Sequence, residues 1–188
     1  MILFASPKEN GNTALLVKWF IKGAKSKGAK VELVNTAKLK YKVNGCTSCQ
    51  ECQHSFKYQC VIPDEASPLI ARIPQVDVLV LATPIYFLGP TAQLKLFLDR
   101  MYSLFKFERG TGKVRHHLNN LQLCLLASAS GGPGHGLSLT NDTFKSLAEV
   151  IGIKFSSLFV PAAGVSGTIK SNKGIQRKAI ALGSKLAN

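Results

Sequence analysis

The residues best suited to chemistry are four cysteines gathered in one short segment. Cys46, Cys49 and Cys52 are each separated by two residues, and Cys60 follows after seven more. Thiolates spaced this closely can all turn inward onto one small inorganic body, which is how proteins hold iron–sulfur clusters. The same side chains could instead bind zinc, form disulfides or take no part in metal binding. The residue types alone leave these alternatives open.

Two further observations favour an iron–sulfur cluster over zinc and metal binding over disulfides. Zinc ribbons usually present two separated Cys-x-x-Cys pairs, so the tight spacing of the first three cysteines favours a cluster over zinc. Bunched cysteines also fit metal ligation in a reducing compartment better than the disulfide framework of a secreted protein. The fifth cysteine, Cys124, lies in the apolar run 123–126 and is expected to be a buried structural thiol.

A polar loop after the first apolar run, residues 2–5, is a second candidate site. It leads directly into a predicted helix, whose first backbone N–H groups lack partners and favour a phosphate. The loop has neither the Gly-Lys-Ser/Thr ending of a Walker loop nor the spaced glycines of a dinucleotide fingerprint, so a monophosphate such as that of FMN fits best. The alternative is that its side chains only cap the helix. The candidate phosphate ligands are Ser6, Lys8, Asn10, Asn12 and Thr13.

The elements that must position these residues alternate between strands and helices. Short continuous apolar runs are typical of strands buried on both faces of a parallel sheet, and segments of helical period separate them. The alternation predicts βαβ units and a doubly wound α/β fold. The expected strands are residues 2–5, 30–34, 76–82, 121–127 and 156–160, and the expected helices are 14–28, 64–70, 91–104, 143–151 and 174–186.

The loops after three of these strands are expected to form one ligand crevice. Open α/β sheets bind ligands outside the carboxyl ends of their strands, where the topology reverses. Loops rich in Gly, Ser and Thr follow strands in that position at residues 6–13, 83–90 and 128–136. The four histidines have no ligand spacing with the cysteines, and no Ser–His–Asp or Cys–His grouping suggests a hydrolase.

The length and composition indicate one globular unit. With 188 residues, 46% of them hydrophobic, the chain is long enough for one core and too short for two ordinary domains. We expect a single domain over residues 1–188 with a cysteine-rich loop at 44–62. No apolar stretch reaches the roughly 18 residues of a membrane helix, and the first residues do not form a signal-peptide core. A cytoplasmic protein without a membrane partner is therefore expected.

The charge balance is strongly basic, with 24 Lys and Arg against 10 Asp and Glu, a net charge of +14. Such a surface attracts nucleic acids, anionic membranes or acidic proteins. The lysines are scattered and no aromatic-interleaved motif accompanies them, so no nucleic acid is expected. Two interpretations remain, a solvated basic face and the docking of an acidic redox protein such as ferredoxin.

Four motifs occur in the order and spacing of one protein family. They are the loop 6–13, the cysteine run that continues through residues 61–65, the segment 82–87 and the segment 93–100. Together they resemble the NADPH-dependent FMN reductase family and, more narrowly, its iron–sulfur flavoprotein branch. The resemblance covers essentially the whole chain. It implies a flavodoxin-like fold, five parallel strands with helices on both faces, and FMN bound non-covalently at the carboxyl edge of the sheet.

Carried over by position, the resemblance assigns the FMN site to the three loops. The first would hold the phosphate, with Lys8 where relatives usually have arginine. The second would line the isoalloxazine ring and ribityl chain, although Tyr86 and Phe87 could merely pack under the loop. A flavin contact of His135 is a further alternative. The second and third loops contribute Thr83, Pro84, Ile85, Tyr86, Phe87, Ser128, Ser130, Gly131, Gly132 and Gly134.

The iron–sulfur branch implies a [4Fe–4S] cluster on Cys46, Cys49, Cys52 and Cys60 that exchanges electrons with FMN. No catalytic side chain is expected, because the redox chemistry belongs to the cofactors. The family also implies a homodimer or homotetramer. The alternative functions are an NAD(P)H-dependent FMN or quinone reductase without a functional cluster, and a zinc-stabilised protein without catalysis. Asp99 and Arg100 are expected to fix their helix by ion pairing.

Overall fold

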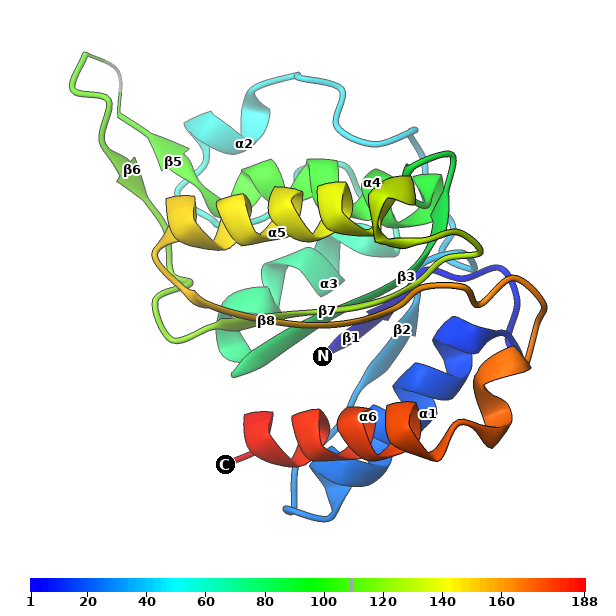
Figure 1. Ribbon diagram of the computed structural model, residues 1–188. Helices are drawn as coiled ribbons and strands as arrows, with labels where there is room; N and C mark the ends of the chain where they lie inside the picture. The colour runs from blue at the N-terminus through cyan, green and yellow to red at the C-terminus, as the bar shows by residue number, and fades with distance from the viewer. Residues whose placement is uncertain (109) are drawn as a thin grey trace.

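The computed structural model describes residues 1–108 and 110–188 and is built around a parallel sheet (Figure 1). Its five parallel strands lie in the order β2 (Leu33–Asn35), β1 (Ile2–Phe4), β3 (Val78–Tyr86), β7 (Gln122–Ser128) and β8 (Lys154–Val160). The two-residue strand β4 (Gly89–Pro90) adds to β3 in antiparallel direction. This strand order is that of flavodoxin-like folds, so the predicted fold class is confirmed.

The register of the sheet brings the ends of three strands to one level. Phe4 of β1 pairs with Ala82 of β3, and two residues further along β3 Pro84 pairs with Ser128 of β7. Because all three strands run in the same direction, the loops that follow them leave the sheet at the same edge. The topology reverses between β1 and β3, and this is where such folds bind ligands.

Helices cover both faces of the sheet (Figure 1). On one face lie α1 (Asn12–Lys25) and α6 (Lys173–Leu186), and on the other α3 (Ala66–Ala71), α4 (Ala92–Leu98) and α5 (Ser138–Ile151). Alternate strand residues point to opposite faces, so each face has its own apolar core. Ile2, Phe4, Val80, Ala82, Cys124 and Leu126 face α1 and α6, whereas Leu3, Leu79, Leu81, Leu123 and Leu125 face the other layer.

The pair α1 and α6 crosses backbone to backbone at two glycines. A Cβ atom built on Gly23 would overlap the Ile180 carbonyl, and one built on Gly183 would overlap the Phe20 carbonyl. Only residues without a side chain permit this approach. The crossing fixes the direction of α1, and therefore the position of its first turn at the carboxyl edge.

Several short elements lie outside the regular pattern. The cysteine loop contains α2 (Glu51–His54), the 3-10 turn η1 (Ile73–Gln75) follows α3, and η2 (Asp99–Leu104) continues α4. The π-helical turn η3 (Pro133–Leu137) precedes α5, and η4 (Thr168–Ser171) precedes α6. A hairpin of β5 (Lys106–Phe107) and β6 (Val114–Arg115) extends away from the body.

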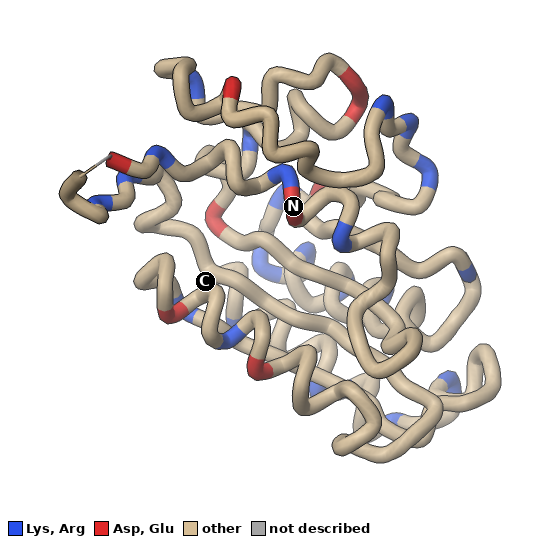
Figure 2. Tube along the Cα trace, turned by 90° about the horizontal axis from the view of Figure 1, so that it is seen from above, with Lys and Arg blue, Asp and Glu red and all other residues tan. Residues whose placement is uncertain are grey.

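The surface charge is distributed over many elements. Figure 2 shows Lys and Arg along helices, loops and the hairpin.

Within the described residues, no helix combines the length and apolar character needed to cross a membrane.

Candidate functional site

The first loop presents the start of α1 without a side-chain cap. Gly11 is the N-cap residue, and no side chain in the described residues caps the helix there. No acidic residue lies in the first turn. Ser6 is buried, and its hydroxyl accepts a hydrogen bond from the Lys8 amide at 3.2 Å. The polar residues of this loop therefore do not serve as helix caps, and the first amides of α1 remain available for an anion.

Thr13 connects the first loop to the third. Its hydroxyl lies 2.9 Å from that of Ser128, and both side chains are buried. A hydroxyl can donate one hydrogen bond and accept two, so each retains capacity for a ligand. The two residues are brought together by the register of β1, β3 and β7.

The Asn12 side chain does not join the Thr13 and Ser128 hydroxyls but binds a different segment. Its amide nitrogen donates to the carbonyls of Ala163 (3.0 Å) and Val165 (2.8 Å), and its oxygen accepts from the Ile169 amide at 3.3 Å. The side chain is thus occupied by the segment after β8, which lies outside the predicted site. Asn10 is exposed, and its carbonyl accepts from the Ser166 hydroxyl at 3.3 Å in that same segment.

The second loop is a tight hairpin with an unusual backbone. The turn between β3 and β4 consists of Phe87 (φ 46°) and Leu88 (φ 68°), both left-handed. Tyr86 is 46% exposed and Phe87 fully exposed. Pro84 and Ile85 are partly buried between the strand and this turn.

Thr83 fixes the base of the hairpin to the helix that follows it. Its hydroxyl accepts from the Thr91 amide at 3.1 Å, and the Thr91 hydroxyl donates to the Ala5 carbonyl at 2.9 Å. Thr91 is also the N-cap of α4. The predicted ligand Thr83 is fully buried, so its side chain stabilises the base of the hairpin from inside the protein.

The third loop packs closely on the second. A Cβ atom on Gly136 would lie 2.6 Å from the Leu88 backbone, and Gly136 itself has φ +96°. His135 folds back onto the loop, where its Nδ1 accepts from the Gly132 amide at 3.1 Å. The predicted residues Ser130, Gly132 and Gly134 lie along the same segment. Glycine is needed here because it allows one loop to touch the backbone of the other.

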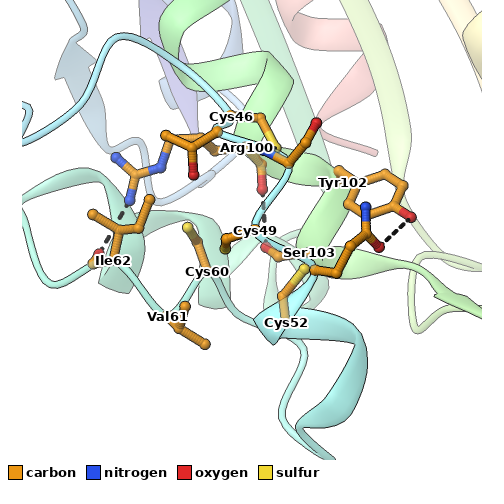
Figure 3. A pocket seen from close by; sticks show the side chains of 12 residues that line it. Cys46, Cys49, Cys52, Cys60, Val61, Ile62, Arg100, Tyr102 and Ser103 are labelled. Carbon is orange, nitrogen blue, oxygen red and sulfur yellow. Dashed lines mark hydrogen bonds between the residues drawn. The ribbon is translucent and has the colours of Figure 1, made fainter.

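The four cysteines line one pocket (Figure 3). Cys46 and Cys49 are exposed, Cys60 is half-buried and Cys52 is buried, and all are free thiols. Burial raises the pKa of the Cys52 thiol. In residues 1–108 and 110–188, no three His, Cys, Asp or Glu side chains are arranged to hold a single metal ion. A cluster differs from an ion in that each thiolate binds its own iron, which places the thiolates farther apart.

The backbone of the cysteine loop has an unusual conformation on both sides of Cys49. Ser48 (φ 54°) and Gln50 (φ 61°) are both left-handed, and they flank Cys49 on either side. The Ser48 amide donates to the Cys46 sulfur at 3.5 Å. Backbone turns that contain left-handed residues can group successive N–H donors into concavities that bind phosphates and iron–sulfur clusters. The donor set and the backbone of this loop therefore fit a cluster.

A buried ion pair closes the other side of this pocket. Nη1 of Arg100 donates to Oδ2 of Asp64 at 2.6 Å, both side chains are essentially inaccessible, and Nη2 donates to the Ile62 carbonyl at 3.2 Å. Burial alone would raise the pKa of Asp64, but hydrogen bonds from Arg100 and from the Lys42 amide outweigh it and lower that pKa. Asp99 pairs with Lys95. Asp99 and Arg100, the two residues expected to form ion pairs, therefore each have a partner of opposite charge.

The hairpin β5–β6 holds the far end of the cysteine loop. Gln53 of α2 donates to the Phe105 carbonyl (2.9 Å) and accepts from the Phe107 amide (3.2 Å). The Lys106 ammonium donates to the carbonyls of Cys52 and Lys57. Burial lowers the pKa of Lys106. These contacts were not predicted, because two-residue strands leave no periodic pattern.

Cys124 lies apart from the other cysteines in the middle of β7. It is fully buried, and burial raises its pKa to about 12. A thiol with such a pKa stays protonated at neutral pH and is not a nucleophile. The structure thus places Cys124 in the core, where the sequence predicts it.

A family model matches most of the chain, and curated relatives match about half of it. The family model described as NADPH-dependent FMN reductase matches residues 1–166. A protein named iron-sulfur flavoprotein from Archaeoglobus fulgidus is 34% identical over 99 residues, which are 53% of this chain and 43% of that protein. An iron-sulfur flavoprotein of Methanocaldococcus jannaschii is 33% identical over 95 residues, 50% of this chain and 47% of that protein. The matched part is about half the length of these curated relatives.

Solved structures share the fold over the whole chain. An NAD(P)H:quinone oxidoreductase from Methanothermobacter marburgensis superposes with a TM-score of 0.76 at 18% identity, covering 100% of this chain and 96% of that one. An FMN-dependent NADH-azoreductase from Bacillus anthracis, solved in complex with FMN, gives 0.75 at 13% identity, covering 100% and 98%. At such identities the likeness concerns the fold alone.

Proposed function

Because the chain belongs to the NADPH-dependent FMN reductase family, we propose that it is an oxidoreductase of the iron–sulfur flavoprotein type. It holds FMN at the carboxyl edge of the sheet and a [4Fe–4S] cluster in the cysteine loop, and it passes electrons between them and an external redox partner. NAD(P)H is the proposed donor for the flavin. Bound FMN would supply hydride and single-electron chemistry, and a bound cluster would supply one-electron transfer.

The phosphate of FMN is assigned to the first turn of α1. The free amides at the helix start, the hydroxyls of Ser6 and Thr13 and the positive charge of Lys8 would bind it, because a helix N-terminus and a nearby cation both favour an anion. Asn10 lies at the rim of the same loop. Asn12 would act indirectly, since its amide is engaged by the segment 163–169 and keeps that segment against the loop.

The flavin ring is assigned to the space between the second and third loops. Backbone N–H groups of residues 83 and 85–87 would hydrogen-bond the ring (Pro84 has none), and the glycine-rich segment 128–134 would let it approach the backbone. The contact of Gly136 with Leu88 supports this arrangement, because it locks the two loops together. These loops bind and orient; no side-chain acid or base is assigned to the reaction.

One observation carries the cluster assignment: four thiols from two separate stretches of chain line a single pocket. Cys60 reaches it from the segment beyond α2, held in place by the Ser67 hydroxyl on its carbonyl. The Ser48 amide, which donates to the Cys46 sulfur, and the buried cation Arg100 place hydrogen-bond donors beside the thiols, which suits a negatively charged cluster.

Protein purified without oxygen tests the assignment. We expect broad visible absorbance beneath the flavin bands, with iron, sulfide and FMN all present in the same sample. Cys49→Ala should lose the iron and keep the FMN, because the two sites use different loops. Cys124→Ala is the matched control, since it removes a cysteine outside the pocket and should keep both. Wild-type protein without iron, or iron retained in Cys49→Ala, would contradict the assignment.

The second candidate is an NAD(P)H-dependent FMN or quinone reductase without a functional cluster. The exposure of Cys46 and Cys49 favours it, because ligands at the surface are weakly shielded. Rapid bleaching of the flavin by NADPH alone, in protein free of iron, would support this candidate. Stoichiometric zinc without iron would instead support the zinc-stabilised alternative.

The proposed partners follow from the surface. A second copy of the chain, in a homodimer or homotetramer, would cover the exposed tip formed by Tyr86, Phe87 and Leu88. An acidic redox protein such as ferredoxin fits the net charge of +14. Analytical ultracentrifugation tests the first partner, and the dependence of electron transfer on ionic strength tests the second.

A further inference from the structure

Arg100 is the largest side chain among the fully buried residues, with 1% exposure. Two of its three nitrogens have partners, Asp64 for Nη1 and the Ile62 carbonyl for Nη2. The third, Nε, is buried and has no hydrogen-bond partner among the described residues. Buried donors are nearly always paired, so an orphaned N–H on a buried cation indicates a partner that is still to arrive.

The guanidinium lies at the cysteine pocket. Arg100, Cys60 and Ile62 all line it, and Figure 3 shows Arg100 beside the cysteines with its dashed bond toward Ile62. Burial would lower the pKa of Arg100, but the Asp64 carboxylate and the nearby Cys60 sulfur outweigh it and raise that pKa. The two partners already present fix the plane of the guanidinium, so the direction of the Nε–H bond is fixed as well.

We propose that Arg100 is a positioning residue of the cysteine pocket whose Nε–H donates to the Cys60 thiolate when the cluster is bound. This inference rests on the proposed function. A hydrogen bond from a cation to a ligating sulfur stabilises the more negative state of a cluster, and hydrogen bonds to sulfur are among the factors that set its reduction potential. Arg100 thus favours the reduced form, and Asp64 holds it in place.

The position of Arg100 in the chain also couples the pocket to the flavin loops. It lies on η2, the direct continuation of α4, and α4 begins at Thr91, which is bonded to Thr83 and Ala5 at the carboxyl edge. One continuous helical element therefore carries the Cys60 contact at one end and braces the second loop at the other. A change at Arg100 acts on the pocket without touching the flavin side chains.

The test is a redox titration of the cluster in protein purified without oxygen, followed by electron paramagnetic resonance. Arg100→Lys keeps the charge opposite Asp64 but removes the Nε–H. We expect unchanged FMN content, a more negative cluster midpoint, and a ratio of reduced to oxidised cluster about tenfold lower at a fixed solution potential, the equivalent of one charge-assisted hydrogen bond. Arg72→Lys, the same exchange in the exposed pair with Glu32, is the control and should leave the midpoint unchanged.

The outcomes separate the two levels of inference. A cluster in Arg100→Lys with the wild-type midpoint overturns the role of Arg100 and leaves the proposed function standing. Wild-type protein that binds FMN but no iron overturns both. If Arg100→Lys does not fold, the double variant Asp64→Asn/Arg100→Gln removes both charges together and serves in its place. The cluster midpoint of this double variant should be as negative as the one expected for Arg100→Lys. A wild-type midpoint in the double variant overturns the inference.

Discussion

Thr13 and Ser128 are 115 positions apart in the chain, yet their hydroxyl oxygens lie 2.9 Å from each other in a buried position. The contact joins the first turn of α1 to the end of β7 across the point where the sheet topology reverses. It places two hydroxyls next to the free amides of the helix start. The proposed phosphate site therefore depends on an alignment of strands, which the sheet register provides.

Replacing Thr13 by valine tests this site. The change keeps the shape of the side chain and removes one hydrogen bond to a charged phosphate, so we expect FMN affinity to fall about tenfold; the loss of the buried bond to Ser128 should also lower the free energy of unfolding by about 1–3 kcal/mol. Quenching of flavin fluorescence on titration measures the affinity. Thr143→Val, on the exposed face of α5, is the matched control. Equal affinity of wild type and Thr13→Val would argue against the phosphate assignment.

The glycine crossing of α1 and α6 gives a prediction for stability. In Gly23→Ala the new methyl group would overlap the Ile180 carbonyl, so the helices must separate. We expect the free energy of unfolding to fall by about 1–3 kcal/mol, as measured by urea denaturation. Gly89→Ala, where a Cβ meets nothing within 4 Å, provides the comparison. A variant at Gly23 as stable as wild type would mean that the helices do not cross here.

The periodicity of the sequence predicts the sheet and its main helices. Buried runs such as 78–82 and 122–127 became β3 and β7, because a strand covered on both faces must be apolar throughout. The hairpin β5–β6 was missed, since its strands are two residues long and largely exposed. Asn12 was assigned to the phosphate although its amide holds the segment 163–169, a contact of more than 150 positions that no local pattern records.

The ion pair of Arg100 and Asp64 shows which part of the ion pairing expected of Arg100 the sequence could indicate. Phe97 and Met101 are buried on the inner face of α4 and η2, and Arg100, three residues after Phe97, lies on that same face. A charge in an apolar stripe must be paired when it is buried. The partner could not be read from the sequence, because 36 positions separate the two residues and only the tertiary fold brings them together.

The depressed pKa of Asp64 predicts a dependence of stability on pH. Hydrogen bonds lower it below the ordinary value of 3.8, so the carboxylate stays ionised in the folded chain at a pH where it is protonated in the unfolded chain. Its contribution is complete above about pH 5, where the group is ionised in both states, and is lost as pH falls through the folded pKa. We expect the free energy of unfolding of wild type to approach that of Asp64→Asn as the pH is lowered from about 5 through the folded pKa. A difference in the free energy of unfolding between the two proteins that does not change with pH would contradict the lowered pKa of Asp64.

The turn between β3 and β4 carries strain that can be removed. Phe87 and Leu88 both occupy the left-handed region, where a side chain is unfavourable by roughly 1–2 kcal/mol, and turns of this kind prefer Asn-Gly. Phe87→Asn/Leu88→Gly should therefore raise the free energy of unfolding by about 1 kcal/mol, while FMN affinity falls because an aromatic wall of the proposed ring site is gone.

Urea denaturation and flavin titration on the same samples separate these two effects. Phe56→Asn is the matched control, because Phe56 is 99% exposed in the cysteine loop and its backbone is not left-handed. That variant should leave both quantities unchanged. A double variant that is more stable and binds FMN as tightly as wild type would remove Phe87 from the flavin site. The strain would then serve another purpose, such as presenting the tip to a second copy of the chain.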